Sequence, residues 1–145
     1  MSGKEPAKIA REFVNAFNTA NWTTLKGFLT PDAIYSEVGT QRKIQGPDQI
    51  VKTFQDWKRT MTDAKGTVTN ALDSDVYGIL EINWQGTQDG PFNGPSGTIP
   101  PSGKRQTTPA ALIVKLKGDK VQEIHHYFDM LSFLQQIGAM STTNA

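Results

Sequence analysis

The sequence predicts a single α+β domain in which a curved, mostly antiparallel sheet packs against N-terminal helices. Helical periodicity dominates residues 6–63, whereas strand-like patterns dominate from Lys65 onward. Most of these strands are separated by short, turn-rich gaps, which favour antiparallel hairpins because parallel strands need long crossovers. The chain has 145 residues, of which 37% are hydrophobic and 20% charged, and no linker or repeat divides residues 1–145. This length and composition suit one domain with one core.

Apolar spacing predicts three helices in the N-terminal part of the chain. The first spans residues 6–19, the second lies within residues 22–29, and the third runs from Pro47 to between residues 60 and 63. Their apolar positions are Ile9, Phe13, Phe17, Trp22, Leu25, Phe28, Ile50, Phe54, Trp57 and Met61. Pro31 is expected to close the second helix, because proline disfavours helical geometry at the residue before it.

Alternating or continuous apolar runs predict the strands. They are residues 33–38, 67–72, 76–87, 106–117 and 120–128. Residues 89–104 contain too many glycines and prolines for a regular element, so we expect a long ordered loop that acts as a lid or a dimer edge. A closing helix starts at Met130 and stops at Gly138, and residues 141–145 are expected to form a frayed tail.

Charge and composition exclude several classes of function. Fifteen basic and fourteen acidic residues are scattered along the chain, which leaves a formal charge of +1 and no nucleic-acid footprint. Cysteine is absent, so thiolate chemistry is excluded. Charged residues interrupt the segment from Met1 to Phe17, which therefore lacks the apolar centre of a signal peptide. We expect a cytoplasmic protein that does not enter a membrane.

Three sequence blocks together resemble one known family. The C-terminal block runs from Gly118 to Asp129 and continues into a Leu-rich helix that ends with residues 135–138, Gln-Gln-Ile-Gly. The second block is residues 84–90 followed by residues 99–104, and a softer third is residues 38–40 leading into residues 45–48. In this order and spacing they resemble the SnoaL-like polyketide cyclases, a ketosteroid isomerase-like family of the nuclear transport factor 2-like superfamily.

The resemblance implies a cone-shaped fold around one internal pocket for a hydrophobic small molecule. It also implies a homodimer and a cofactor-independent acid/base enzyme, a cyclase or isomerase that acts through enolate or aldol chemistry on a carbonyl compound. Two alternatives stay open, because fold does not determine function. One is a non-catalytic binding module, and the other is a dehydratase or epoxide hydrolase.

Asp129 is the first catalytic candidate, because it matches the catalytic carboxylate of the resembled family. A carboxylate can remove a proton next to a carbonyl group when an apolar cavity raises its pKa. The alternative is a structural role, since an aspartate directly before an apolar helix is a favoured N-cap. Both roles can coexist.

His125 is the second catalytic candidate. It shares strand parity with Tyr127 and Asp129, whereas His126 shares parity with Ile124, so only one of the two histidines faces the pocket. We expect His125 and Tyr127 to face inward, with Tyr127 contacting substrate and His126 outside; a surface histidine is the competing interpretation for His125. The two histidines point apart, so they predict no metal site.

The remaining site candidates are expected to bind substrate. They are Tyr35, Glu37, Gln88, Trp57 and Phe54. Tyr35 is predicted to donate to an enolate oxygen, with an ordinary core tyrosine as the competing interpretation. Glu37 is a candidate second acid, against which an ion-paired edge glutamate is the simpler interpretation. Gln88 stands where many members of the resembled family have histidine, and glutamine cannot change its charge near neutral pH.

Overall fold

The computed structural model describes residues 5–94 and 97–140, so the predicted tail at residues 141–145 lies outside the described part. The helices are α1 (Pro6–Asn18), α2 (Trp22–Gly27), α3 (Pro47–Thr60) and α4 (Met130–Gln136). The strands are β1 (Leu29–Glu37), β2 (Arg42–Gln45), β3 (Lys65–Ser74), β4 (Tyr77–Thr87), β5 (Phe92–Gly94), β6 (Gly97–Ile99), β7 (Arg105–Lys117) and β8 (Lys120–Phe128).

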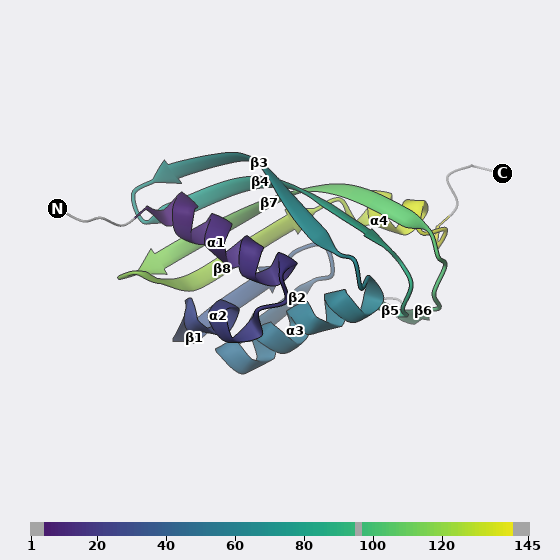
Figure 1. Ribbon diagram of the computed structural model, residues 1–145, viewed down its shortest axis with the longest axis horizontal. Coiled ribbons are helices and arrows are strands. Elements are labelled where there is room, and N and C mark those ends of the chain that lie inside the picture. The colour runs from purple at the N-terminus through teal and green to yellow at the C-terminus, as the bar shows by residue number, and fades with distance from the viewer. Residues whose placement is uncertain (1–4, 95–96, 141–145) are drawn as a thin grey trace.

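A six-stranded sheet in the order β2-β1-β8-β7-β4-β3 forms the body of the molecule. Its neighbours pair antiparallel, except β1 and β8, which run parallel. The strands arch around α1, α2 and α3, while α4 lies at the end of the sheet where β8 finishes (Figure 1). The predicted α+β class, with a curved and mostly antiparallel sheet, is confirmed.

The core lies between the helices and the inner face of the sheet. α1 buries the apolar stripe that its sequence predicted, and Phe13 and Phe17 each meet the ring of Phe54 from α3 edge to face. Leu80 and Val114 project from β4 and β7 into the same core and are fully buried. The three helices and the sheet therefore share one apolar interior.

Three parts of the predicted outline are wrong. α2 ends at Gly27, and Pro31 lies inside β1, which begins earlier than expected. The register of β1 against β8 shifts between Leu29 and Ile34, so the missing N–H of Pro31 leaves no ladder hydrogen bond unmade. β2 was not predicted, because its alternation covers only four residues. β5 and β6 form a short hairpin inside the segment predicted to be irregular.

Candidate functional site

An apolar pocket lies between α1, α3 and the inner face of the sheet. It holds about 690 Å³ of empty space, including the space at its mouth. Its walls are largely aromatic, and the contributing rings include Phe13, Phe17, Phe54, Trp57, Phe128 and Phe133. Such walls suit a hydrophobic ligand, and the few polar side chains among them decide how that ligand is oriented.

His126 is the titratable imidazole of this pocket. It is buried, with 7% of its surface exposed, and lines the pocket together with Tyr35 and Trp84. β8 places it there, because Ile124 and His126 point to the same inner face and Ile124 is fully buried. The pocket therefore contains an imidazole that the sequence analysis placed outside.

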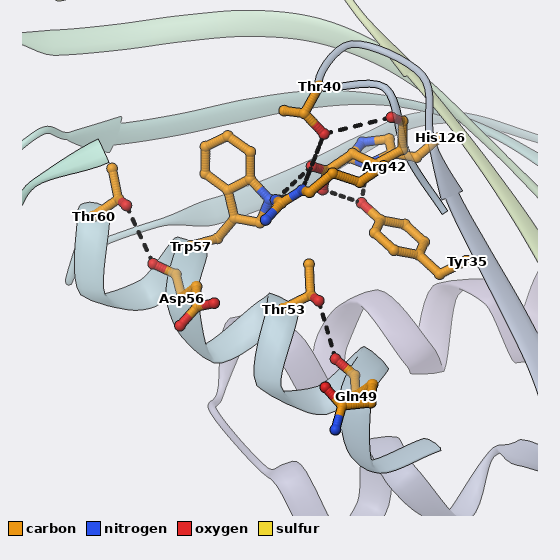
Figure 2. A network of polar contacts seen from close by, with 10 residues as sticks. Tyr35, Thr40, Arg42, Gln49, Thr53, Asp56, Trp57, Thr60 and His126 are labelled. Carbon is orange, nitrogen blue, oxygen red and sulfur yellow. Dashed lines mark hydrogen bonds and ion pairs between the residues drawn. The ribbon is translucent and has the colours of Figure 1, made fainter. Parts of the chain in front are cut away.

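Glu37 anchors a polar network directly behind the pocket wall. The carboxylate is fully buried and accepts hydrogen bonds from Tyr35 at 2.6 Å and from the Trp57 indole at 2.8 Å. Arg42 forms an ion pair with the other carboxylate oxygen at 2.6 Å, and the Thr40 hydroxyl donates to the same oxygen. Figure 2 shows these donors converging from β1, the β1–β2 segment, the start of β2 and α3. Each contact satisfies a charge that would otherwise be costly to bury.

The network fixes the proton positions on His126. The Trp84 indole N–H can only donate, and it lies 2.9 Å from Nε2 of His126, so Nε2 must be the accepting nitrogen. In the neutral ring Nδ1 then carries the hydrogen and donates to the Tyr35 hydroxyl oxygen at 2.7 Å. Tyr35 in turn donates to Glu37. The chain Glu37–Tyr35–His126 thus directs the free electron pair of the imidazole toward Trp84.

Burial, neighbouring charges and hydrogen bonds together determine the ionisation of the three groups. Desolvation lowers the pKa of His126 to about 4, against the opposing charge of Glu37. Burial also raises the pKa of Tyr35 well above its ordinary value, and the neighbouring Glu37 charge adds to this effect. Burial alone would raise the pKa of Glu37, but Arg42 and the hydrogen-bond donors outweigh it and hold that pKa low. At neutral pH the network is a carboxylate, a phenol and a neutral imidazole.

The predicted orientation of His125 and Tyr127 is wrong. Tyr127 is 45% exposed on the outer face of β8, and His125 lies on the same face, 3.4 Å from Glu123. The prediction that only one of the two histidines faces the pocket is correct, but that histidine is His126 and not His125. Burying Ile124 and Phe128, the apolar residues on either side of His126 on its own face of β8, carries His126 inward and turns His125 and Tyr127 outward.

Asp129 occupies the helix-capping position that the sequence also allowed. Its side chain is exposed and accepts from the backbone N–H of Ser132 at 3.0 Å, which caps α4. It is not among the residues that line the pocket. The dehydratase or epoxide hydrolase alternative requires Asp129 to lie within hydrogen-bond reach of Glu37 or His125. In the described part of the chain no hydrogen bond joins Asp129 to either residue.

Gln88 organises the loop after β4 and does not line the pocket. Its fully buried amide donates to the carbonyl groups of Gly90 and Pro100, and its oxygen accepts from the backbone of Ser102. The loop then inserts Phe92 against the ring of Trp57, with 5.3 Å between the ring centroids. Gln88 therefore acts through the loop, and it is not among the residues that line the pocket.

The structure brings some predicted residues together and adds others. Tyr35, Phe54 and Trp57 line the pocket, and Glu37 lies directly behind them. Sequence reasoning missed His126, Thr40 and Arg42 as parts of the site. The signal for His126 was its parity with Ile124 and Phe128, whereas Thr40 and Arg42 precede or begin an unpredicted strand.

In the described part of the chain, none of the helices is long and apolar enough to cross a membrane. Within residues 5–94 and 97–140, histidine, aspartate and glutamate form no group of three with metal-binding geometry.

Solved structures with the same fold include proteins described by different activities. IdmH from Streptomyces antibioticus, a candidate polyketide cyclase, is 19% identical, with a TM-score of 0.79 over 92% of this chain and 99% of that chain. AclR from Streptomyces galilaeus, a candidate hydroxylase, is 18% identical, with a TM-score of 0.79 over 94% and 87%. A Catenulispora acidiphila protein with a ketosteroid isomerase-like fold, solved with trimethylamine, is 16% identical, with a TM-score of 0.80 over 97% and 100%. At these identities the similarity shows the fold.

The sequence itself identifies the family. No curated protein matches the chain. The family profile of the SnoaL-like polyketide cyclases, however, matches residues 7–137, which includes every strand of the main sheet and the pocket lining. The chain therefore belongs to the SnoaL-like polyketide cyclase family.

Proposed function

We propose that the protein is a cofactor-independent acid/base enzyme, a cyclase or isomerase that acts on a hydrophobic carbonyl compound. The observation that carries the proposal is the buried chain Glu37–Tyr35–His126, which ends at an accepting nitrogen in an aromatic pocket. A base held in one tautomer by a second group and a third is the usual arrangement for proton transfer. We place the base at His126 rather than at the exposed Asp129.

The proposed step is removal of a proton from the carbon next to the ligand carbonyl group. Nε2 of His126 takes the proton, and the electrons of the C–H bond form an enolate. The imidazolium produced donates from Nδ1 to Tyr35, while the Glu37 charge behind it stabilises the new positive charge. Returning the proton from Nε2 to another atom of the ligand gives an isomerase. Attack of the enolate carbon on a second carbonyl group of the same molecule breaks that C=O π bond, and the alkoxide formed takes the proton from Nε2, which gives a cyclase.

One observation favours the binding-module alternative. Every buried side-chain nitrogen and oxygen atom among the described residues has a hydrogen-bond partner, and Nε2 of His126 is occupied by Trp84. A pocket whose polar groups are paired with each other can hold an apolar ligand without reacting with it. Turnover, rather than binding, separates the two functions.

The test is exchange of the α-protons of 2-tetralone for deuterium in D₂O, followed by NMR. The wild-type protein is expected to accelerate exchange over buffer, and His126→Gln to lower the catalysed rate by about 100-fold or more. Asp129→Asn is the matched control, because asparagine caps a helix as well as aspartate, and it is expected to keep the rate.

Three outcomes would count against the proposal. Loss of exchange in Asp129→Asn but not in His126→Gln would return the base to Asp129. Equal rates in all three proteins would exclude both residues. Saturation-transfer NMR that detects bound 2-tetralone without accelerated exchange would favour a binding module.

A further inference from the structure

The Trp84–His126 hydrogen bond is the most readily exchanged polar contact of this site. The bonds around Glu37 are charge-assisted, and such bonds are about twice as strong as those between neutral groups. The bond from Trp84 to His126 joins two neutral groups, is only partly buried, and connects two residues that both line the pocket. An entering ligand therefore meets a donor and an acceptor that it can separate.

These two nitrogens make different demands on a ligand atom. The indole N–H of Trp84 needs an acceptor, and Nε2 of His126, whose tautomer is fixed from behind, needs a donor. A hydroxyl group supplies both through one oxygen. A carbonyl or ether oxygen satisfies Trp84 but leaves Nε2 without its partner, and leaving a buried acceptor unpaired weakens binding.

We infer that the ligand recognised here carries a hydroxyl group on an enolic or aromatic carbon, which inserts between Trp84 Nε1 and His126 Nε2. The apolar rings that line the pocket hold the attached hydrophobic frame. This inference rests on the proposed function and deepens it. A site that binds an enol better than the parent ketone lowers the barrier to enolisation.

A second polar pair in the pocket provides the rival site. Thr108 donates to Gln106 at 2.5 Å, and Gln106 donates to the sulfur of Met61, so these groups also line the pocket in paired form. Thr108 and Gln106 stand on β7 and Met61 follows α3, whereas His126 stands on β8 and Trp84 on β4. Thr108→Val removes a hydroxyl from this second pair and leaves the first intact, which makes it the matched control.

The experiment compares 2-naphthol with 2-methoxynaphthalene by titration calorimetry. The two probes share their rings and differ in the hydroxyl hydrogen, and 2-naphthol is the aromatic counterpart of the enol of 2-tetralone. In the wild-type protein 2-naphthol is expected to bind about tenfold more tightly, the effect of one buried acceptor left unpaired. His126→Phe is expected to abolish this preference, and Thr108→Val to keep it.

The wild-type comparison needs no variant, so a folding defect cannot obscure it. Equal affinity for the two probes, or a preference that Thr108→Val removes and His126→Phe does not, would overturn the inference. Failure here is distinguishable from failure of the proposed function. If exchange of 2-tetralone depends on His126 but 2-naphthol is not preferred, the proposed function stands and the inference fails. If 2-naphthol is preferred but no exchange occurs, the hydroxyl site stands and the proposed function fails.

Discussion

Glu37 shows how one residue can hold a charge inside this apolar core. Its two carboxylate oxygens accept from four side chains: Tyr35, Thr40, Arg42 and Trp57. Such complete pairing offsets the large cost of taking an ion out of water. Because Tyr35 and Trp57 also line the pocket, the same contacts fix two of its walls and the orientation of the imidazole.

The buried imidazole predicts a loss of stability in mild acid. The pKa of His126 is about 4 in the folded protein because burial lowers it, against an ordinary value of 6.5. Between these values the unfolded chain binds a proton that the native protein does not bind. The free energy of unfolding therefore falls as pH falls from 6.5 to 4, with a contribution of about 3 kcal/mol from this group.

Urea denaturation at neutral pH and near pH 4 checks this prediction. His126→Gln lacks the titrating group, while its amide can still donate to Tyr35, so it is expected to lose about 3 kcal/mol less than wild type between the two conditions. Comparing the difference between pH values removes the contribution of the carboxylates that both proteins share. Identical pH dependence in the two proteins would contradict the prediction.

For single residues, the sequence predicted which side chains lie at the pocket better than it predicted which face of β8 points inward. Tyr35, Phe54 and Trp57 were found because aromatic residues at strand or helix spacing tend toward an interior. The sequence analysis prefers His125 to His126 because it assumes that Asp129, the position matching the family's catalytic carboxylate, faces the pocket, and His125 shares its strand parity. The apolar residues of β8 make that choice in the structure, since burying Ile124 stabilises the fold more than burying a histidine.

At the scale of elements, the segment after β4, residues 88–104, is fixed at its ends by hydrogen bonds and packs against the pocket wall. Gln88 ties its two ends together through Gly90 and Ser102, and Phe92 packs between Trp57 and Phe133. Both aromatic partners line the pocket. Where the structure describes it, the segment predicted to be a lid or a dimer edge therefore packs behind two residues of the pocket wall.

Gly90 is the tightest point of this segment. A Cβ atom there would lie 1.9 Å from the carbonyl oxygen of Arg59, and its N–H donates to the carbonyl of Thr60 at 3.0 Å. Gly90→Ala must push the loop off the end of α3, so we expect a destabilisation of about 2 kcal/mol or more.

Gly27→Ala is the matched control for this substitution. A Cβ at Gly27 meets nothing within 4 Å, and the residue ends α2. Because alanine favours a helix by up to about 1 kcal/mol over glycine, this variant is expected to be neutral or slightly stabilised. Thermal unfolding of both variants measures the contrast, and similar melting temperatures would show that the loop adjusts freely.

Element boundaries were predictable where a pattern is long and failed where it is short. β8 was predicted at its observed bounds, because nine residues alternate between two clear turns. β2 has four residues and takes its strand geometry from pairing with β1, information that no local pattern contains. The pairing of β1 with β8 is likewise non-local, so the meeting of Tyr35 and His126 could not be predicted from either strand alone.

At the scale of the whole molecule, the outer face of the sheet carries an apolar stripe. Leu72, Ile79 and Ile113 are paired in register across β3, β4 and β7 and are exposed or half-buried. On β8 the partner of Ile113 is His125, and the exposed Tyr127 pairs with Ala111. Leu72 and Tyr127 are 53% and 45% exposed. Apolar residues gathered on one face in this way are typical of an interaction surface.

We propose that this stripe joins two copies of the chain, as the sequence resemblance implied. Ile113→Lys places a charge in its middle and is expected to shift a dimer to a monomer in sedimentation velocity. Val38→Lys is the control, because Val38 is also apolar and exposed, at 47%, but follows β1. A wild-type monomer at the highest concentration tested, or equal behaviour of the two variants, would contradict the proposal.

The parallel pairing of β1 with β8 also sets an order of events during synthesis. Tyr35 and His126 meet across 91 positions of the chain, and the strand that carries His126 is made long after the one that carries Tyr35. Contacts so distant must wait for a large loop to close, which slows folding. Until β8 arrives, the edge of β1 that it will cover is unpaired, and unpaired strand edges promote aggregation. The hydrogen-bonded chain Glu37–Tyr35–His126 can therefore form only among the last contacts of a nascent molecule. A product truncated before β8 would expose the unpaired edge of β1 and would contain no partly active site.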